Sequence, residues 1–242
     1  MSADRTTDDV PARSRPGEPA YLVFSDADET LIRCKSLLEF LDHYFAERHG
    51  TRGRRHAADV RARLTAATAA GMARDEANAL YYRAWRGEPL AEIQRSGRRW
   101  YAARRAAGGF FVDATWAALR RHRAAGAELV LVSGSFAAVL DPLAEECGAA
   151  HVLCTRPAVA DGVLTGEVVG EPMIGEGKRR AVRALLARRP HIDPADCHAY
   201  GDHVSDLPML LEVGHPTVAG GSADLIERLR AARRVGPGVS GR

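Results

Sequence analysis

The pattern of hydrophobic positions predicts short strands that alternate with helices. Unbroken apolar runs predict strands at 21–25, 128–135, 151–154, 197–201 and 216–219. Apolar residues spaced by three and four predict helices at 113–125, 137–146, 178–187, 205–211 and 223–232. Asp113 is expected to be the N-cap of the first of these helices. Strands that alternate with helices are typical of a parallel α/β sheet.

Two segments depart from this alternation. Residues 34–109 carry helical periodicity and no strand signal, with Gly50, Gly71 and Gly87 as breaks between helices. This segment is expected to form a separate helical bundle inserted after the first strand. Residues 159–168 are expected to form a β-hairpin whose turn contains Asp-Gly at 161–162.

The domain boundaries follow from these elements. We expect a core made of 20–33 and 110–234, with 34–109 as an inserted all-helical cap. The segments 1–19 and 235–242 contain little that a core could bury, and they are expected to be disordered tails.

Composition narrows the possible functions without naming one. Of 242 residues, 46% are hydrophobic, which suffices for a substantial core. The net charge of +3, from 34 Lys and Arg against 31 Asp and Glu, argues against a nucleic-acid partner. No apolar stretch suits a membrane span or a signal peptide, so we expect a cytoplasmic protein without a membrane partner. The oligomeric state is left open.

Polar residues gather where the predicted strands end. Asp26 and Asp28 follow the first strand, Ser133-Gly134-Ser135 closes the second, Lys178 opens a later helix, and 201–206 follows another strand. Each has an ordinary structural interpretation when taken alone, as a helix cap or a solvated charge. In a parallel sheet, however, these strand ends share one edge, so the four clusters are expected to converge.

Converging groups of these kinds suit phosphoryl chemistry. Asp26 and Asp28 repel each other unless a cation or proton lies between them, and Mg²⁺ prefers such oxygen ligands. Ser133 and nearby backbone N–H groups can hold phosphate oxygens, and Lys178 adds a positive charge. Asp202 is a further acidic ligand for the metal. Asp28 is the candidate acid for the leaving oxygen, and later the base that activates water.

The motifs, in their order along the chain, resemble those of the haloacid dehalogenase superfamily of phosphohydrolases. They are Asp26-Ala-Asp28-Glu-Thr30, Ser133 at a strand end, Lys178, and Gly201-Asp202-x-x-x-Asp206-Leu-Pro-Met-Leu. The last run and the helical insertion after the first motif resemble the phosphoserine-phosphatase-like branch, subfamily IB. The resemblance covers about 20–220 and implies a Rossmann-like core with a helical cap.

The resemblance also implies roles for individual residues. Asp26 is expected to form an aspartyl phosphate, with Asp28 as acid and then base. Mg²⁺ is expected on Asp26, Asp202 and the backbone carbonyl of Asp28. The remaining expected roles are phosphoryl binding by Ser133, Gly134 and Lys178, and support of the site by Thr30, Ser205 and Asp206.

One departure from the pattern bears on the substrate. Phosphoserine phosphatases carry a Glu that holds the substrate's ammonium group, and Lys35 stands at that position here. A cation there repels an amine, so phosphoserine itself is not the expected substrate. Ser135 and His203 are unusual in their motifs, and Arg83 is a candidate for the lid with 81, 82, 85 and 86; these residues are expected to tune specificity.

The expected function is therefore a Mg²⁺-dependent phosphomonoesterase acting on a small phosphorylated metabolite. Two other functions remain open on the sequence. A phosphotransferase or phosphomutase would pass the same aspartyl phosphate to another hydroxyl group. A non-catalytic phospho-receiver would be labelled without turnover, although it needs no acid such as Asp28.

Overall fold

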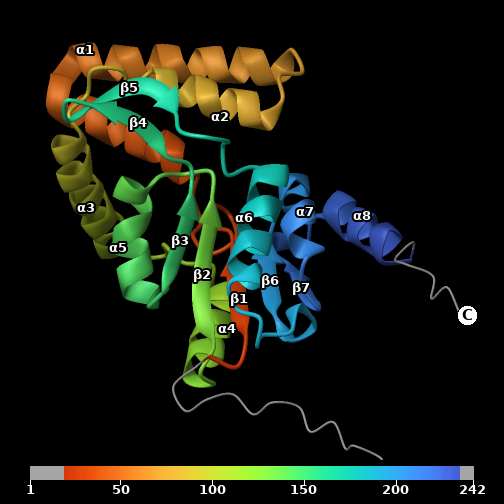
Figure 1. Ribbon diagram of the computed structural model, residues 1–242. Helices are drawn as coiled ribbons and strands as arrows, with labels where there is room; N and C mark the ends of the chain where they lie inside the picture. The colour runs from red at the N-terminus through yellow and green to blue at the C-terminus, as the bar shows by residue number, and fades with distance from the viewer. Residues whose placement is uncertain (1–18, 235–242) are drawn as a thin grey trace, which may run out of the picture.

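A five-stranded parallel sheet forms the centre of the computed structural model, which describes residues 19–234 (Figure 1). Its strand order is β3-β2-β1-β6-β7, and every neighbouring pair runs parallel, so the α/β class expected from the sequence is confirmed. The tails expected at 1–19 and 235–242 lie outside the described residues, apart from Pro19. The strands are β1 (Leu22–Ser25), β2 (Glu128–Ser133), β3 (His151–Cys154), β6 (His198–Gly201) and β7 (His215–Val218).

Alternating side chains along the strands create two separate cores. Leu22 and Phe24 of β1 face one core, whereas Val23 faces the other, because successive strand residues point to opposite faces. On the first face lie α6 (Glu176–Ala187), α7 (Leu207–Leu210) and α8 (Ala223–Arg234), and on the second lie α4 (Asp113–Ala124) and α5 (Ala137–Cys147). Short 3₁₀ turns are η1 (Pro194–Asp196), η2 (Val204–Asp206) and η3 (Ala219–Gly221).

A helical layer covers the carboxyl end of the sheet (Figure 1). It contains α1 (Ser36–Ala69) and α2 (Arg74–Arg83), whereas α3 (Leu90–Ala106) lies beside α5. The expected break at Gly50 is present as a kink within α1, where φ is 56° and ψ is −131°. The hairpin β4 (Pro157–Ala160) and β5 (Val163–Val168) lies outside the main sheet and packs on α2, so it belongs spatially with these helices.

The start of α4 differs from the expectation. Asp113 is the first residue inside the helix, and Val112 occupies the N-cap position without a side-chain capping bond. The carboxylate of Asp113 instead accepts a hydrogen bond from Nη2 of Arg33 at 2.8 Å. A negative charge in the first turn also interacts favourably with the helix dipole. An aspartate is therefore favoured both at this position and at the N-cap, and the sequence does not distinguish the two.

The cap is fastened to the core mainly through α3. Gly97 lies so close to α5 that a Cβ atom there would meet the backbone oxygen of Ala138 at 1.9 Å. Bidentate contacts from Arg98 to Glu145, and a 2.5 Å hydrogen bond from the Tyr101 hydroxyl to Glu146, surround this approach. The missing side chain therefore lets two helices from different parts of the chain pack backbone to backbone.

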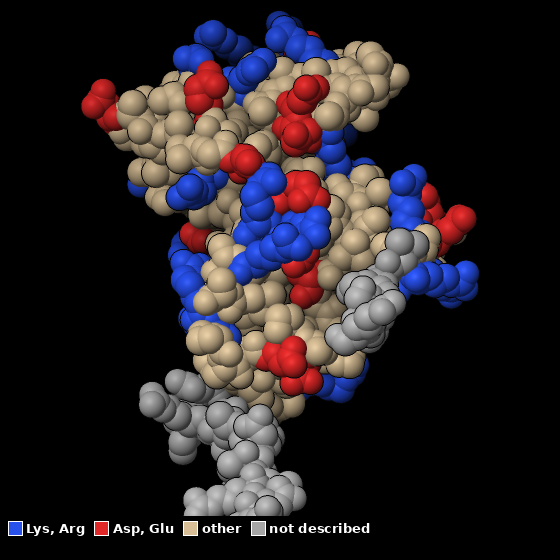
Figure 2. All heavy atoms as spheres, turned by 45° about the vertical axis from the view of Figure 1, so that its right-hand side comes forward, with Lys and Arg blue, Asp and Glu red and all other residues tan. Residues whose placement is uncertain are grey.

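The surface offers no simple clue to a partner. Acidic and basic side chains are intermixed over the face in Figure 2, and many are paired, as Arg179 and Arg183 are with Glu212. Over residues 19–234, no helix combines the length and apolar character that crossing a bilayer requires.

Replacing Gly97 with alanine tests the close packing of α3 on α5. Helix propensity alone predicts a gain of up to about 1 kcal/mol in the free energy of unfolding. The contact with Ala138 should reverse the sign and give a loss of about 1–3 kcal/mol, measured by urea unfolding. Ala102→Gly, at an exposed position of the same helix, is the matched control for propensity. A Gly97→Ala protein as stable as the parent would contradict the packing described.

Candidate active site

The strand ends bring the four polar clusters together beneath the cap. Asp26 directly follows β1, Ser133 ends β2, and Asp202 directly follows β6. Lys178 lies in the first turn of α6, and its side chain is 98% buried. The Asp26 N–H donates to the Tyr200 carbonyl of β6 at 3.0 Å, so the hydrogen bonds between β1 and β6 continue one residue past the end of β1. The sheet therefore sets the position of the Asp26 side chain directly.

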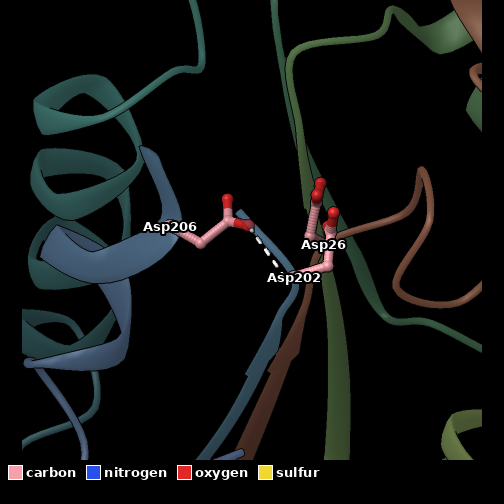
Figure 3. A group of neighbouring side chains, drawn as sticks. All are labelled: Asp26, Asp202 and Asp206. Carbon is pink, nitrogen blue, oxygen red and sulfur yellow. Dashed lines mark hydrogen bonds between the residues drawn. The ribbon is translucent and has the colours of Figure 1, made fainter. Parts of the chain in front are cut away.

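Three carboxylates form the centre of the site. Oxygens of Asp26, Asp202 and Asp206 lie within 4.8 Å of one another. In Figure 3, Asp26 and Asp202 point the same way from neighbouring strand ends, and Asp206 points toward them from the side. The Lys178 ammonium lies 2.8 Å from Oδ1 of Asp26 and 2.7 Å from Oδ1 of Asp206. One buried cation therefore bridges two of the three acids.

Asp206 uses both of its oxygens within the protein. Oδ1 accepts from Lys178, and Oδ2 accepts from the backbone N–H groups of Asp202 and His203 at 3.2 and 3.0 Å. Gly201 permits this arrangement, since a Cβ atom there would meet Cβ of Asp206 at 2.6 Å. Asp206 therefore orients both Lys178 and the loop that carries Asp202.

Burial and charge set the protonation of this group. Burial raises the pKa of Asp26 to about 8, against the attraction of Lys178 and with added repulsion from Asp206 and Asp28. Burial would likewise raise the pKa of Asp206, but Lys178 and the hydrogen bonds outweigh it and the net shift is downward. The pKa of Lys178 is raised because Asp206 and Asp26 outweigh its own burial. Lys178 is therefore cationic, with Asp206 as its anionic partner.

Asp28 lies close enough to Asp26 to repel it, although it is not one of the three clustered acids. Its Oδ2 accepts a hydrogen bond from the Ser36 N–H at 2.9 Å, while its buried Oδ1 has no partner among the described residues. The turn after it contains Glu29 at φ 58°, a strained conformation for a residue with a side chain. Burial raises the pKa of Asp28 to about 6. A carboxyl with such a pKa can hold or release a proton near neutral pH.

The acidic cluster fits a divalent cation. Asp26, Asp28, Asp202 and Asp206 supply four carboxyl groups, and Lys178 is the cation in contact with this group among the described residues. An uncompensated surplus of buried acids is costly unless protons or a metal relieve it. The donors are oxygens, which suit a hard cation such as Mg²⁺. Thr30 orients one of them by donating to Oδ1 of Asp202 at 2.8 Å.

The loop after β2 faces this centre and is held from the cap. Ser133 is buried, and its hydroxyl oxygen accepts from the Ser135 N–H at 3.2 Å. Two side chains of α2 reach the Gly134 carbonyl, with Nδ2 of Asn78 at 2.9 Å and the Tyr82 hydroxyl at 3.0 Å. The cap therefore fixes the loop that carries Ser133, a connection that helical periodicity in the sequence does not reveal.

A cavity of about 470 Å³ joins the centre to the cap. Of the residues singled out from the sequence, thirteen line it or contact its charged centre directly, among them Lys35, Tyr81, Ser135 and His203. Its lining is Asp26, Asp28, Glu29, Lys35, Leu37, Leu38, Leu64, Thr68, Met72, Arg74, Ala77, Asn78, Tyr81, Ser133, Gly134, Ser135, Ile174, Lys178, His203, Ser205 and Asp206.

Arg83 does not line the cavity. Its side chain is exposed, and its Cα lies against Gly166 of the hairpin. Tyr82, Trp85 and Arg86 do not line it either; Tyr82 contacts the Gly134 loop, Trp85 is fully buried, and Arg86 pairs with Glu167.

Among the arginine and aromatic residues of the cap, Arg74 and Tyr81 line the cavity. Arg74 begins α2 and was not singled out from the sequence. Only its position at the N-terminus of the helix that follows Gly71 could have indicated it.

His203 has a structural partner. Its Nδ1 accepts from the Ser205 N–H at 3.0 Å and lies 3.1 Å from the Ser205 hydroxyl, so the imidazole caps η2. Burial lowers its pKa, and the charge of Arg74 adds to this effect. The imidazole is therefore neutral at pH 7, with its proton on Nε2.

These observations define a class of α/β protein. Its members have a parallel sheet with an aspartate directly after the first strand, and a helical cap over the carboxyl end of that sheet. The model of the family "haloacid dehalogenase-like hydrolase" matches residues 23–211. The chain belongs to this family, which confirms the resemblance drawn from the motifs and supports the prediction of a hydrolytic enzyme.

Two relatives in Mycobacterium tuberculosis differ in how much of the chain they match. A probable phosphatase is 43% identical over 98 residues, covering 40% of this chain and 33% of that protein. The match thus spans about a third of that relative's length. A phosphoserine phosphatase is 29% identical over 230 residues, covering 88% of this chain and 71% of that protein.

A solved structure shows the same arrangement over nearly the whole described chain. A protein with unknown function from Bordetella pertussis Tohama I superposes with a TM-score of 0.74 at 25% identity. The superposition covers 89% of this chain and 97% of that one. The combination of sheet and cap therefore recurs as a unit.

Replacing Asn78 with leucine tests how the cap holds the Ser133 loop. The isosteric change removes the bond to the Gly134 carbonyl and the 3.2 Å bond from the Thr155 hydroxyl, leaving buried groups unpaired. We expect a loss of about 2 kcal/mol in the free energy of unfolding. Tyr82→Phe removes only one donor to the same carbonyl and should cost less. Equal stability of Asn78→Leu and the parent would mean that the contact is not maintained in solution.

Proposed function

We propose that the protein is a Mg²⁺-dependent phosphomonoesterase that acts on a small phosphate ester. The observation that carries the proposal is the placement of Asp26, Asp28, Lys178 and Ser133 around one cavity beneath the cap. A nucleophilic carboxylate needs an electrophile that accepts an anion, and a phosphoryl group does so once its oxygens are neutralised.

The first half of the reaction forms an aspartyl phosphate. An oxygen of Asp26 attacks phosphorus, the bond from phosphorus to the ester oxygen breaks, and Asp28 gives its proton to the departing oxygen. Lys178 and the Ser133 hydroxyl contact the phosphoryl oxygens, where charge accumulates. The raised pKa of Asp28, caused by its burial, supports its role as the proton donor.

The second half regenerates the enzyme. Asp28, now ionised, takes a proton from water, and the water oxygen attacks phosphorus. The bond between phosphorus and Asp26 breaks, which releases inorganic phosphate and restores both carboxyl groups.

Asp26, Asp202 and the backbone carbonyl of Asp28 would hold the Mg²⁺ ion. When bound, the ion supplies positive charge that draws Asp26 and a phosphoryl oxygen together despite their like charges. Asp206 stays committed to Lys178 and to the loop of Asp202, which supports a positioning role for it. Thr30 likewise positions Asp202.

The rim of the cavity argues against phosphoserine as the substrate. Apart from Asp26, Asp28 and Asp206, Glu29 is the one acid among the described lining residues. It lies 3.6 Å from the Lys35 ammonium. An amine would find that carboxylate already paired, with Arg74 also nearby on the rim. The rim therefore favours a substrate without a positive charge.

The nucleophile is tested with Asp26→Asn and an aryl phosphate. We expect release of inorganic phosphate to fall below about one thousandth of the parent rate, while the fold is retained. Removing Mg²⁺ with a chelator should also stop the parent enzyme. Asp113→Asn removes an exposed carboxylate and is the matched control. Full activity of Asp26→Asn would refute the mechanism, stoichiometric labelling without turnover would favour a receiver, and phosphate passed to an added alcohol would favour a transferase.

Leaving groups of different basicity test Asp28. Asp28→Asn should lower kcat for alkyl phosphates by about 10²–10⁴, because an alkoxide needs a proton in order to leave. An aryl phosphate with a nitro substituent needs no such help, so we expect a burst of phenolate, equal to the enzyme concentration, before slow turnover. Stopped-flow absorbance measures both phases. Equal losses on both substrates, without a burst, would assign Asp28 a structural role.

A further inference from the structure

Part of the wall of the cavity that contains the aspartates is aliphatic. The aliphatic residues come from the start and end of α1, the following turn and α2, and each is partly buried: Leu37, Leu38, Leu64, Met72 and Ala77. We propose that this wall binds an unbranched hydrocarbon chain on the leaving alcohol of the substrate. The proposal deepens the proposed function, on which it rests, by assigning the substrate class of alkyl or acyl-bearing phosphate monoesters.

The polar groups on this wall are already used within the protein. The Thr68 hydroxyl donates to the Leu64 carbonyl at 2.8 Å, and the Tyr81 hydroxyl donates to the Leu37 carbonyl at 2.9 Å. Both ends of the Asn78 amide are bonded as well. If the leaving alcohol of the substrate carried polar groups, they would lose hydrogen bonds to water here without gaining any to the protein. A hydrocarbon chain has no hydrogen bonds to lose.

Three of the five aliphatic residues lie outside the hydrophobic cores. Leu37 and Leu64 pack against a core cluster, but Leu38, Met72 and Ala77 belong to neither cluster. They lie on the cavity, and their apolar surface is partly exposed. Covering such surface with a hydrocarbon chain is favourable in proportion to the area removed from water.

The wall is continuous with the charged centre. The same cavity of about 470 Å³ is lined by Asp26, Ser133 and Lys178 and by the aliphatic residues. This volume lies within the usual range for small-molecule sites and exceeds what a phosphate group alone would occupy. Lys35 and Arg74 on the rim add positive charge that suits a dianionic head group. The site thus combines charged and aliphatic lining residues, just as an amphiphilic phosphate ester combines a charged head group with a hydrocarbon chain.

The experiment compares n-alkyl phosphates from methyl to octyl with the Mg²⁺-loaded protein. If the wall binds the chain, kcat/KM should rise roughly fourfold for each methylene that enters it, and then reach a plateau. A flat or falling series would overturn the inference. Such a series would leave the proposed function standing, because every ester would still be hydrolysed.

Variants of the wall locate the effect. Leu38→Gln and Met72→Gln should each lower the ratio of octyl to methyl kcat/KM at least severalfold, because a polar amide replaces the apolar contact. Leu211→Gln is the matched control; Leu211 is 36% exposed and does not line the cavity, so the ratio should stay unchanged. A ratio that is unaffected in both wall variants would contradict the assignment.

Binding of n-alkylphosphonates, which cannot be hydrolysed, separates this inference from the catalytic proposal. Their affinity, measured by isothermal titration calorimetry, should rise with chain length as kcat/KM does. Rising affinity without hydrolysis of any ester would refute the phosphatase function but support the apolar wall. Affinity that is independent of chain length would refute the wall.

Discussion

The site depends on one buried ion-pair arrangement, the Lys178 ammonium between Asp26 and Asp206. Burying these charges is costly, and only close contact between opposite charges offsets the loss of water. The arrangement joins the ends of two strands to the first turn of α6, because Asp206 also binds the loop of Asp202. Removing Lys178 would leave two buried acids together, so its positive charge serves both the fold and the chemistry.

The cap contributes to the site as much as the sheet does. Asn78 and Tyr82 of α2 hold the Gly134 carbonyl, and the close approach at Gly97 fixes α3 on α5. The loop that carries Ser133 is therefore held from the cap as well as by β2. Helices α1 and α2 also supply the aliphatic lining, so the cap both holds the Ser133 loop and forms part of the cavity wall.

Sequence reasoning succeeded where local chemistry decides position and failed where a helix face decides it. Asp26, Ser133 and Asp202 are placed by strand ends, which apolar runs reveal directly. Arg83 was assigned to the lid because aromatic and basic residues cluster around it, but its side chain is exposed and its Cα faces the hairpin. Periodicity shows that a helix has an apolar face, but not what that face contacts. Arg74 was missed for the same reason.

The sequence by itself determined the α/β class, the inserted helices and the carboxylates, serine and lysine of the centre. These follow from periods of two and 3.6 residues and from polar residues at strand ends, which are local properties of the chain. Tertiary structure alone decided that Asp206 anchors Lys178, that Asn78 reaches the Gly134 carbonyl, and that Leu38 and Met72 share a cavity with Asp26. These contacts join residues far apart in the chain. Their distances depend on how helices pack across the sheet edge, which no local pattern encodes.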